Sequence, residues 1–254
     1  MFIFITLLIV GLVAGLLSGF FGIGGGVIIV PSLIFFLGYS QKLSNGISLS
    51  ALLLPVSIFA VIKYAKSNFV DKKVAALIAL GIFIGVYGGA KIAVSMPSIL
   101  LKQIYGIFLL YIAIKYLVSK KEGKNEVDFV GHKLRFIALF IGIFAGILSG
   151  LFGIGGGAVI IPALVGIMKF NPKKAAGTSL GALLLPVGLP GVIKYYNAGF
   201  FDIKLAGFVA LGIVIGAYFG AHIAIKLPSK LIKKIFGIFL FIIGLDFVIT
   251  GFIH

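Results

Sequence analysis

Long apolar stretches separated by short polar gaps recur along the whole chain of 254 residues. In the first half they lie at about residues 2–21, 24–38, 44–63, 74–95 and 99–118. In the second half they lie at about residues 134–152, 155–169, 175–194, 205–226 and 230–252. Because runs of roughly 20 apolar residues are typical of membrane-spanning helices, the pattern predicts an all-α polytopic membrane protein embedded in the lipid bilayer.

Composition agrees with this pattern and excludes a water-soluble globular protein. Hydrophobic residues make up 61% of the chain and charged residues only 11%, whereas soluble domains carry about 25% charged residues.

The same sequence unit occurs twice, at an offset of 131 residues (146 minus 15). The segment Gly15–Gly26 returns as Gly146–Gly157, and the match continues without a gap to Gly106 and Gly237. A repeat of this length indicates a duplicated domain. We therefore expect two homologous transmembrane repeats, at residues 1–118 and 134–254, joined by a polar basic linker at residues 119–133.

The positions of the basic residues predict how the repeats cross the membrane. The chain has 22 Lys and Arg residues, 6 Asp and Glu residues and a formal net charge of +16. With five crossings per repeat, 17 of the 22 basic residues fall on one side, whereas four crossings give a split of 12 to 10. Because Lys and Arg collect in cytoplasmic loops, we predict five segments per repeat in the cell membrane. The second repeat is then inverted, the linker is cytoplasmic and both termini are outside.

Several functional classes have no support in the sequence. The basic residues lie at the ends of apolar runs, and no polar region could form a basic groove, so nucleic acid is not expected as a partner. The chain has no Cys, and His132, His222 and His254 are far apart, so we expect neither a metal nor a cofactor. No pattern resembles a catalytic triad or a carboxylate pair, so the sequence predicts that the chain is not an enzyme.

Three consecutive glycines follow the first segment of each repeat, and they are the strongest local signal: Gly24, Gly25, Gly26, Gly155, Gly156 and Gly157. One interpretation is that they open a helix whose free N–H groups and positive dipole end face an anion. The alternative is close packing between helices. Glycines at four-residue spacing favour packing instead, and they occur at Gly81, Gly85, Gly89, Gly212, Gly216 and Gly220.

Hydroxyl side chains lie near the start of the third segment of each repeat, at Ser48, Thr178 and Ser179. They either cap a helix or donate hydrogen bonds to a bound oxyanion. Both uses place them at helix starts.

Four prolines are predicted to break helices, as proline removes a backbone donor: Pro31, Pro55, Pro162 and Pro186. Broken helices near the membrane midplane are where transporter sites lie. Asp246 is the one acid inside a predicted span. It is a candidate for proton or ion coupling, with an interfacial position as the alternative.

The repeated motifs Gly-Phe-Phe-Gly-Ile-Gly-Gly-Gly, ending at Gly26, and Gly-Leu-Phe-Gly-Ile-Gly-Gly-Gly, ending at Gly157, are each followed within five residues by a proline. With Gly177-Thr-Ser-Leu180, they resemble the sulfite exporter TauE/SafE family over nearly the whole chain. The resemblance implies an inner-membrane or plasma-membrane carrier that exports sulfite, sulfoacetate or related sulfur oxyanions. The first repeat departs from the pattern with Gly46-Ile47-Ser48, which lacks a hydroxyl at residue 47.

Together these features predict a secondary transporter that exports a small anion, such as sulfite or an organosulfonate, by alternating access between the repeats. The predicted site is built from the two glycine triplets and the hydroxyl residues. A membrane scaffold or accessory subunit without transport activity is the rival prediction, and an anion channel is a third.

Overall fold

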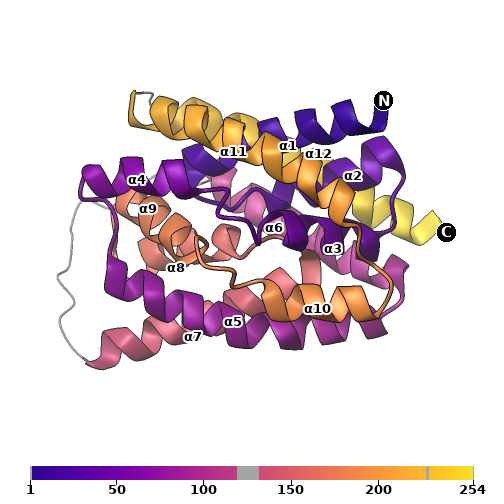
Figure 1. The fold of residues 1–254 in the computed structure, drawn as a ribbon, viewed down its shortest axis with the longest axis horizontal. Coiled ribbons are helices and arrows are strands. Elements are labelled where there is room, and N and C mark those ends of the chain that lie inside the picture. Colours follow the sequence, from indigo (N-terminus) through magenta and orange to yellow (C-terminus); the bar gives the residue numbers. More distant parts are fainter. Residues whose placement is uncertain (1, 119–131, 227–228, 254) are drawn as a thin grey trace.

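The computed structural model describes residues 2–118, 132–226 and 229–253, and every regular element in these ranges is an α-helix. The first half contains α1 (Phe2–Phe21), α2 (Gly26–Leu37), α3 (Gln41–Ala51), α4 (Ile58–Lys66), α5 (Lys72–Ser95) and α6 (Ser98–Val118). The second half contains α7 (His132–Phe152), α8 (Gly157–Gly166), α9 (Pro172–Ala182), α10 (Leu189–Asn197), α11 (Ile203–Lys226) and α12 (Ser229–Ile253). The all-helical prediction is confirmed (Figure 1). The predicted linker at residues 119–133 lies outside the described residues, apart from its last two.

Five described helices are long and apolar enough to cross a membrane: α1, α5, α6, α7 and α11. Their outer surfaces carry exposed aromatic and aliphatic side chains, such as Phe140, which is 67% exposed, and Leu211, which is 58% exposed. A bilayer about 30 Å thick at its hydrocarbon core solvates such surfaces. The chain is therefore a multi-pass membrane protein in contact with lipid.

The second predicted segment of each repeat is shorter than one crossing. Helix α2 has 12 residues and α8 has 10, which at 1.5 Å per residue gives about 18 and 15 Å. The first eight residues of α2 are buried within the protein. These segments therefore enter the protein interior as short helices and do not cross a bilayer as continuous ones.

The prolines fall in two different structural settings. Pro55 lies between α3 and α4, and Pro186 lies between α9 and α10, so each third segment consists of two short helices. In contrast, Pro31 and Pro162 lie inside α2 and α8, which continue beyond them. The helix breaks predicted at Pro31 and Pro162 are therefore wrong. A proline deprives a helix of one hydrogen bond, and the buried surroundings of α2 keep that helix intact.

The most extensive helix contacts join the two halves of the chain, α1 with α11 and α5 with α7. Residue numbers increase in the same direction along α1 and α11 at their contact. Gly11 lies against Val209, Gly15 against Ile213 and Gly19 against Ala217. The two helices are therefore parallel. An added methyl group at any of these glycines would overlap the backbone of α11, so this close approach requires glycine.

Helices α5 and α7 form the equivalent parallel pair. Gly81 lies against Leu139, Gly85 against Ile143 and Gly89 against Ile147. Gly212, Gly216 and Gly220 occupy the same positions in the pair formed by α1 and α11, where they face Leu8, Leu12 and Leu16. The prediction that the four-residue glycine spacing serves packing is confirmed. We call the two pairs the glycine seams.

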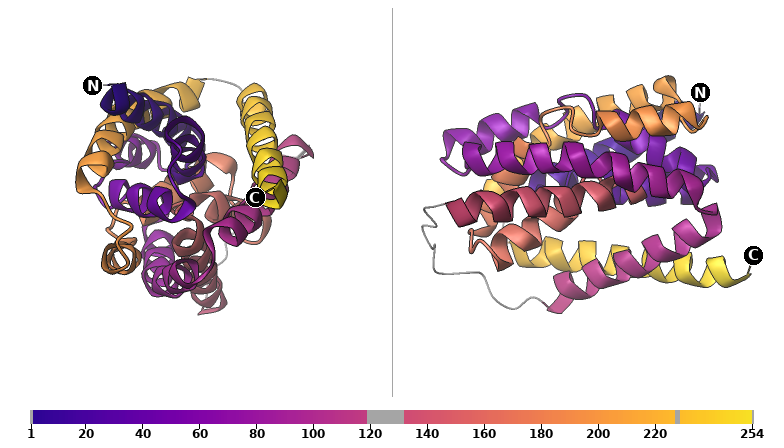
Figure 2. Two further views of the ribbon diagram at one scale, coloured as in Figure 1. Left: turned by 90° about the vertical axis from the view of Figure 1, so that its right-hand side faces the viewer. Right: turned by 90° about the horizontal axis from the view of Figure 1, so that it is seen from below.

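Helices α6 and α12 occupy equivalent positions in the two repeats and run antiparallel. Gly106 lies against Gly244, whereas Gly237 lies against Leu117 near the other end of the contact. Figure 2 shows this pair together at one edge of the bundle. In Figure 1 the N- and C-termini are at the right, whereas α4 and the start of α7 are at the left.

Candidate functional site

A tight turn separates α1 from α2, and an equivalent turn separates α7 from α8. Gly22, Gly24 and Gly25 have φ angles of 75°, 82° and 80°. Their equivalents in the second repeat have the same left-handed conformation: Gly153, Gly155 and Gly156. This region favours glycine because a side chain there costs about 1–2 kcal/mol. We call the two segments, residues 22–26 and 153–157, the glycine turns.

The last glycine of each triplet is required for a different reason. A methyl group on Gly26 would overlap the backbone of Gly153 and Ile154, and one on Gly157 would overlap that of Ile23. The two glycine turns therefore pack directly against each other at the centre of the protein. Sequence reasoning treated packing and anion binding as alternatives, and the structure shows the packing of Gly26 and Gly157, whereas anion binding stays a prediction.

The predicted hydroxyl residues do not lie at helix starts. Ser40 caps α3, since its side chain accepts a hydrogen bond from the amide of Leu43 at 3.3 Å. Asn171 caps α9 through the amide of Lys174 at 2.7 Å, with Pro172 as the first helical residue. The helices begin about seven residues before Ser48 and Ser179, so the predicted capping role is wrong. A proline at the first helical position, where its missing amide has no intrahelical use, explains the earlier start of α9.

Ser48 and Ser179 instead connect the third segment of one repeat to the glycine turn of the other. The Ser48 hydroxyl donates to the carbonyl of Gly153 at 2.6 Å, and the Ser179 hydroxyl donates to the carbonyl of Gly22 at 2.9 Å. Both serines are fully buried. Thr178 accepts a hydrogen bond from the amide of Asp71 at 3.0 Å. In this structure the three hydroxyl groups are committed to protein partners.

Other buried donors satisfy the last carbonyls of α1 and α7. Tyr195 donates to the carbonyl of Gly150 at 2.8 Å, and Asn45 donates to that of Leu151 at 2.9 Å. Tyr64 lies 3.4 Å from the carbonyl oxygens of Gly19 and Phe20. The last carbonyls of a helix have no partner within it. Here side chains supply those partners at the C-terminal ends of both helices.

The first amides of α2 and α8 have no such partners. In the described ranges, none of the N–H groups of residues 23–27 and 154–158 makes a hydrogen bond with the protein. Each glycine turn therefore combines a satisfied helix C-terminus with an unsatisfied helix N-terminus. Helix N-termini carry a partial positive charge, so these amides favour a negatively charged ligand.

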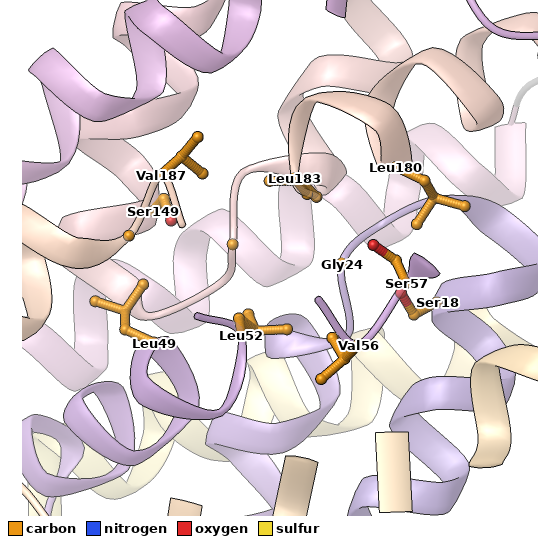
Figure 3. Close-up of a pocket in the computed structure, with 12 residues that line it drawn as sticks. Ser18, Gly24, Leu49, Leu52, Val56, Ser57, Ser149, Leu180, Leu183 and Val187 are labelled. Carbon is orange, nitrogen blue, oxygen red and sulfur yellow. The ribbon is translucent and has the colours of Figure 1, made fainter. Parts of the chain in front are cut away.

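A small cavity lies between the two glycine turns (Figure 3). It has a volume of about 20 Å³, which is room for roughly one water molecule. It is lined by six positions from each repeat, Ser18, Gly24, Leu49, Leu52, Val56 and Ser57, and their equivalents Ser149, Gly155, Leu180, Leu183, Val187 and Gly188. Every lining residue is thus paired with its counterpart 131 residues away, so the cavity lies where the two repeats meet.

The cavity contains three serine hydroxyls that the sequence analysis did not select. Ser18, Ser149 and Ser57 are 2%, 1% and 5% exposed. Within the part of the chain that the structure describes, their hydroxyls have no hydrogen-bond partner. The signal available in the sequence was a serine repeated four residues before each glycine turn, within the apolar C-terminal halves of α1 and α7.

The remaining predicted site residues are distributed unequally around the cavity. Gly24 and Gly155 line it, whereas the other four glycines of the triplets and Ser48, Thr178 and Ser179 are not among its lining residues. Asp246 lies in α12, which packs on α6, and it is not among the lining residues. Its role in coupling stays a prediction. Among the described residues, no cluster of three or more His, Asp or Glu side chains could hold a metal ion.

Known proteins resemble this chain along nearly its full length. Residues 7–247 match the family model described as Sulfite exporter TauE/SafE. A probable membrane transporter protein of Methanocaldococcus jannaschii, MJ0441, is 31% identical, and the match covers 94% of this chain and 93% of that protein. The probable membrane transporter protein YunE of Bacillus subtilis is 28% identical, with 98% of each chain covered. No solved structure matches the chain.

The family is described as an exporter and these relatives are named as probable membrane transporters, which agrees with the prediction that the chain is not an enzyme. The chain is a membrane transporter that belongs to the sulfite exporter TauE/SafE family.

Proposed function

We propose that this protein is a secondary transporter that exports a small anion, and that the anion binds in the cavity between the glycine turns. The terminal carbonyls of α1 and α7 have side-chain donors, whereas the first amides of α2 and α8 have no protein partner. The unpartnered polar groups around the cavity therefore include donors, namely the amides of Gly24 and Gly155 and the hydroxyls of Ser18 and Ser149. An anion is the ligand that such donors stabilise.

The cavity lining favours an anion of low charge. None of the twelve lining residues is charged, and six of them are aliphatic. The Born cost of burying an ion rises with the square of its charge, so a dianion costs about four times as much as a monoanion. A singly charged sulfur oxyanion, such as hydrogensulfite or a small organosulfonate, suits neutral donors. The family description indicates a sulfur oxyanion, and the uncharged lining favours one that carries a single negative charge.

We further propose that the two repeats, residues 1–118 and 134–254, are inverted in the cell membrane, with the linker cytoplasmic and both termini outside. The antiparallel contact of the equivalent helices α6 and α12 supports this arrangement, as does the 17 to 5 division of basic residues.

Equivalent positions in inverted repeats must lie on opposite faces of the membrane. Ser67 follows α4 and its equivalent, Ala198, follows α10. In this chain without cysteine, Ser67→Cys should react with an impermeant maleimide from the cytoplasmic face and Ala198→Cys from the external face. Labelling of both from the same face would rule out inversion.

Transport by this cavity requires a conformational change, because its volume is smaller than a sulfur oxyanion needs. We propose alternating access in which one glycine seam moves relative to the other. Each seam holds one helix from each repeat in backbone contact, so the moving bodies are α1 with α11 and α5 with α7. Movement of the first half against the second would separate both seams.

Flux measurements in proteoliposomes test the proposed function. Purified protein should give saturable uptake of sulfite and of ethanesulfonate, with sulfate and empty liposomes as controls. Ser18→Ala/Ser149→Ala should lose this uptake while keeping the thermal stability of the parent protein. Absence of flux for both sulfur oxyanions from a folded parent protein would exclude the proposed anion export. It would favour the alternative of a membrane scaffold without transport activity. Flux that increases without saturation would identify a channel.

A further inference from the structure

The cavity has one break in its two-fold symmetry. Five of its six residue pairs are identical in the two repeats, whereas Ser57 faces the cavity where the second repeat has Gly188. In the view of Figure 3, Ser57 and Ser18 lie at one end of the cavity near Gly24, and Ser149 lies at the other end. One end therefore presents two hydroxyls and the other end presents one.

The backbone conformation at residue 188 does not require glycine. Its φ and ψ angles of −78° and −9° are ordinary for any residue. A methyl group there would meet the Leu53 and Leu49 side chains at 3.7 and 3.8 Å, which is ordinary van der Waals contact. A serine could therefore occupy this position, as it does at residue 57. The absence of a side chain leaves space beside Leu49 at the end of the cavity that has one hydroxyl.

Ser57 likewise has no structural use for its hydroxyl. It precedes α4 as the N-cap residue, but its side chain makes no capping hydrogen bond. It is 5% exposed, and in the described part of the chain its oxygen has no other protein partner. A buried hydroxyl without a partner loses the hydrogen bonds that water would give it. A ligand in the cavity would restore one of them.

We propose that Ser57 is a specificity-determining residue that fixes the orientation of an unsymmetrical anion. The oxyanion group is held by Ser57 and Ser18, and a short apolar substituent lies in the space beside Gly188 and Leu49. The substrate class is then a singly charged organic oxyanion with a small alkyl group, such as a short alkanesulfonate. This inference rests on the proposed anion site.

Two single substitutions distinguish the ends of the cavity. Ser57→Ala removes a donor to a charged group, so the KM for ethanesulfonate and for sulfite should each increase about 10-fold or more. Gly188→Ser fills the proposed alkyl space, so it should raise the KM for ethanesulfonate by a similar factor. The KM for sulfite should stay within about twofold of the parent value or decrease, because sulfite has no alkyl substituent and the new serine adds a hydrogen-bond donor.

Both variants are measured in proteoliposomes beside the parent protein, with thermal unfolding in detergent as the folding control. Either of two results would overturn the role of Ser57 while leaving the anion site standing. One is an unchanged KM for both anions in Ser57→Ala, and the other is an equal shift for both anions in Gly188→Ser. A folded parent protein that transports neither anion would overturn the proposed function itself, and this inference with it.

Discussion

Two pairs of repeated serines lie close to the glycine turns and have opposite surroundings. Ser48 and Ser179 donate to backbone carbonyls across the boundary between the repeats. Ser18 and Ser149 are equally buried, yet their hydroxyls face a cavity and have no partner among the described residues. A buried hydroxyl is therefore available to a ligand where the backbone carbonyls nearby already have donors.

The largest expected effect comes from the serines that face the cavity. Each hydroxyl that donates to a bound anion contributes about 1.5–3 kcal/mol, so loss of the Ser18 hydroxyl in Ser18→Ala/Ser149→Ala should by itself lower kcat/KM at least about 10-fold. The melting temperature should stay within a few degrees, since the two hydroxyls make no protein contact. A variant with normal transport would show that these serines are ordinary small residues.

The serines that face the carbonyls should give the reverse result. Ser48→Ala and Ser179→Ala each leave a buried carbonyl without its donor, which destabilises the protein by about 1–3 kcal/mol. Chemical unfolding in detergent measures this loss. The KM of the folded fraction should not change, and Ser50→Ala, which removes a hydroxyl bonded only within its own helix, is the matched control. A raised KM would place Ser48 or Ser179 in the anion site.

The glycine turns allow a test that separates backbone conformation from packing. An alanine at Gly25 has space, because the nearest atom outside the turn would be 3.5 Å away, but φ is 80°. We expect Gly25→Ala to cost about 1–2 kcal/mol through strain alone. Gly26→Ala, which overlaps the opposite turn, should be more damaging in the same unfolding assay. Equal losses would contradict the different roles assigned to the two glycines.

The smallest effect is expected at Thr178. The equivalent position in the first repeat is Ile47, so the chain already accepts isoleucine in this setting. Thr178→Ile removes the hydrogen bond to the amide of Asp71, which is only partly buried, and we expect a loss below about 1 kcal/mol. Transport kinetics should be unchanged. A marked change in KM would make Thr178 part of the binding site.

Much of the architecture could be predicted because it depends on local pattern. The duplication, the long apolar helices and the packing role of Gly81, Gly85 and Gly89 follow from spacing along the chain, whereas the second segment of each repeat, predicted as a crossing, is too short for one. The glycine triplets were also singled out correctly as unusual, although their left-handed conformation was not predicted.

The site itself depends on contacts between the repeats, which one sequence does not reveal. Helix α3 begins at Gln41 because Ser40 caps it, although Ser44 and Asn45 are equally plausible capping residues by type. The role of Ser48 depends on the carbonyl of Gly153, which is 105 residues away in the sequence. Pro31 stays inside α2 because tertiary packing compensates for one lost hydrogen bond.

The glycine seams also govern the order in which the protein can assemble during synthesis. Helix α1 is synthesised first, but Gly11 can pack against Val209 only after 198 further residues have been added (209 minus 11). At about 5–20 residues per second, this delay is roughly 10–40 s. Throughout that interval the glycine face of α1 has no permanent neighbour. A nascent chain truncated before α11 therefore carries an unmatched first helix, and membrane quality control has a surface by which to recognise it.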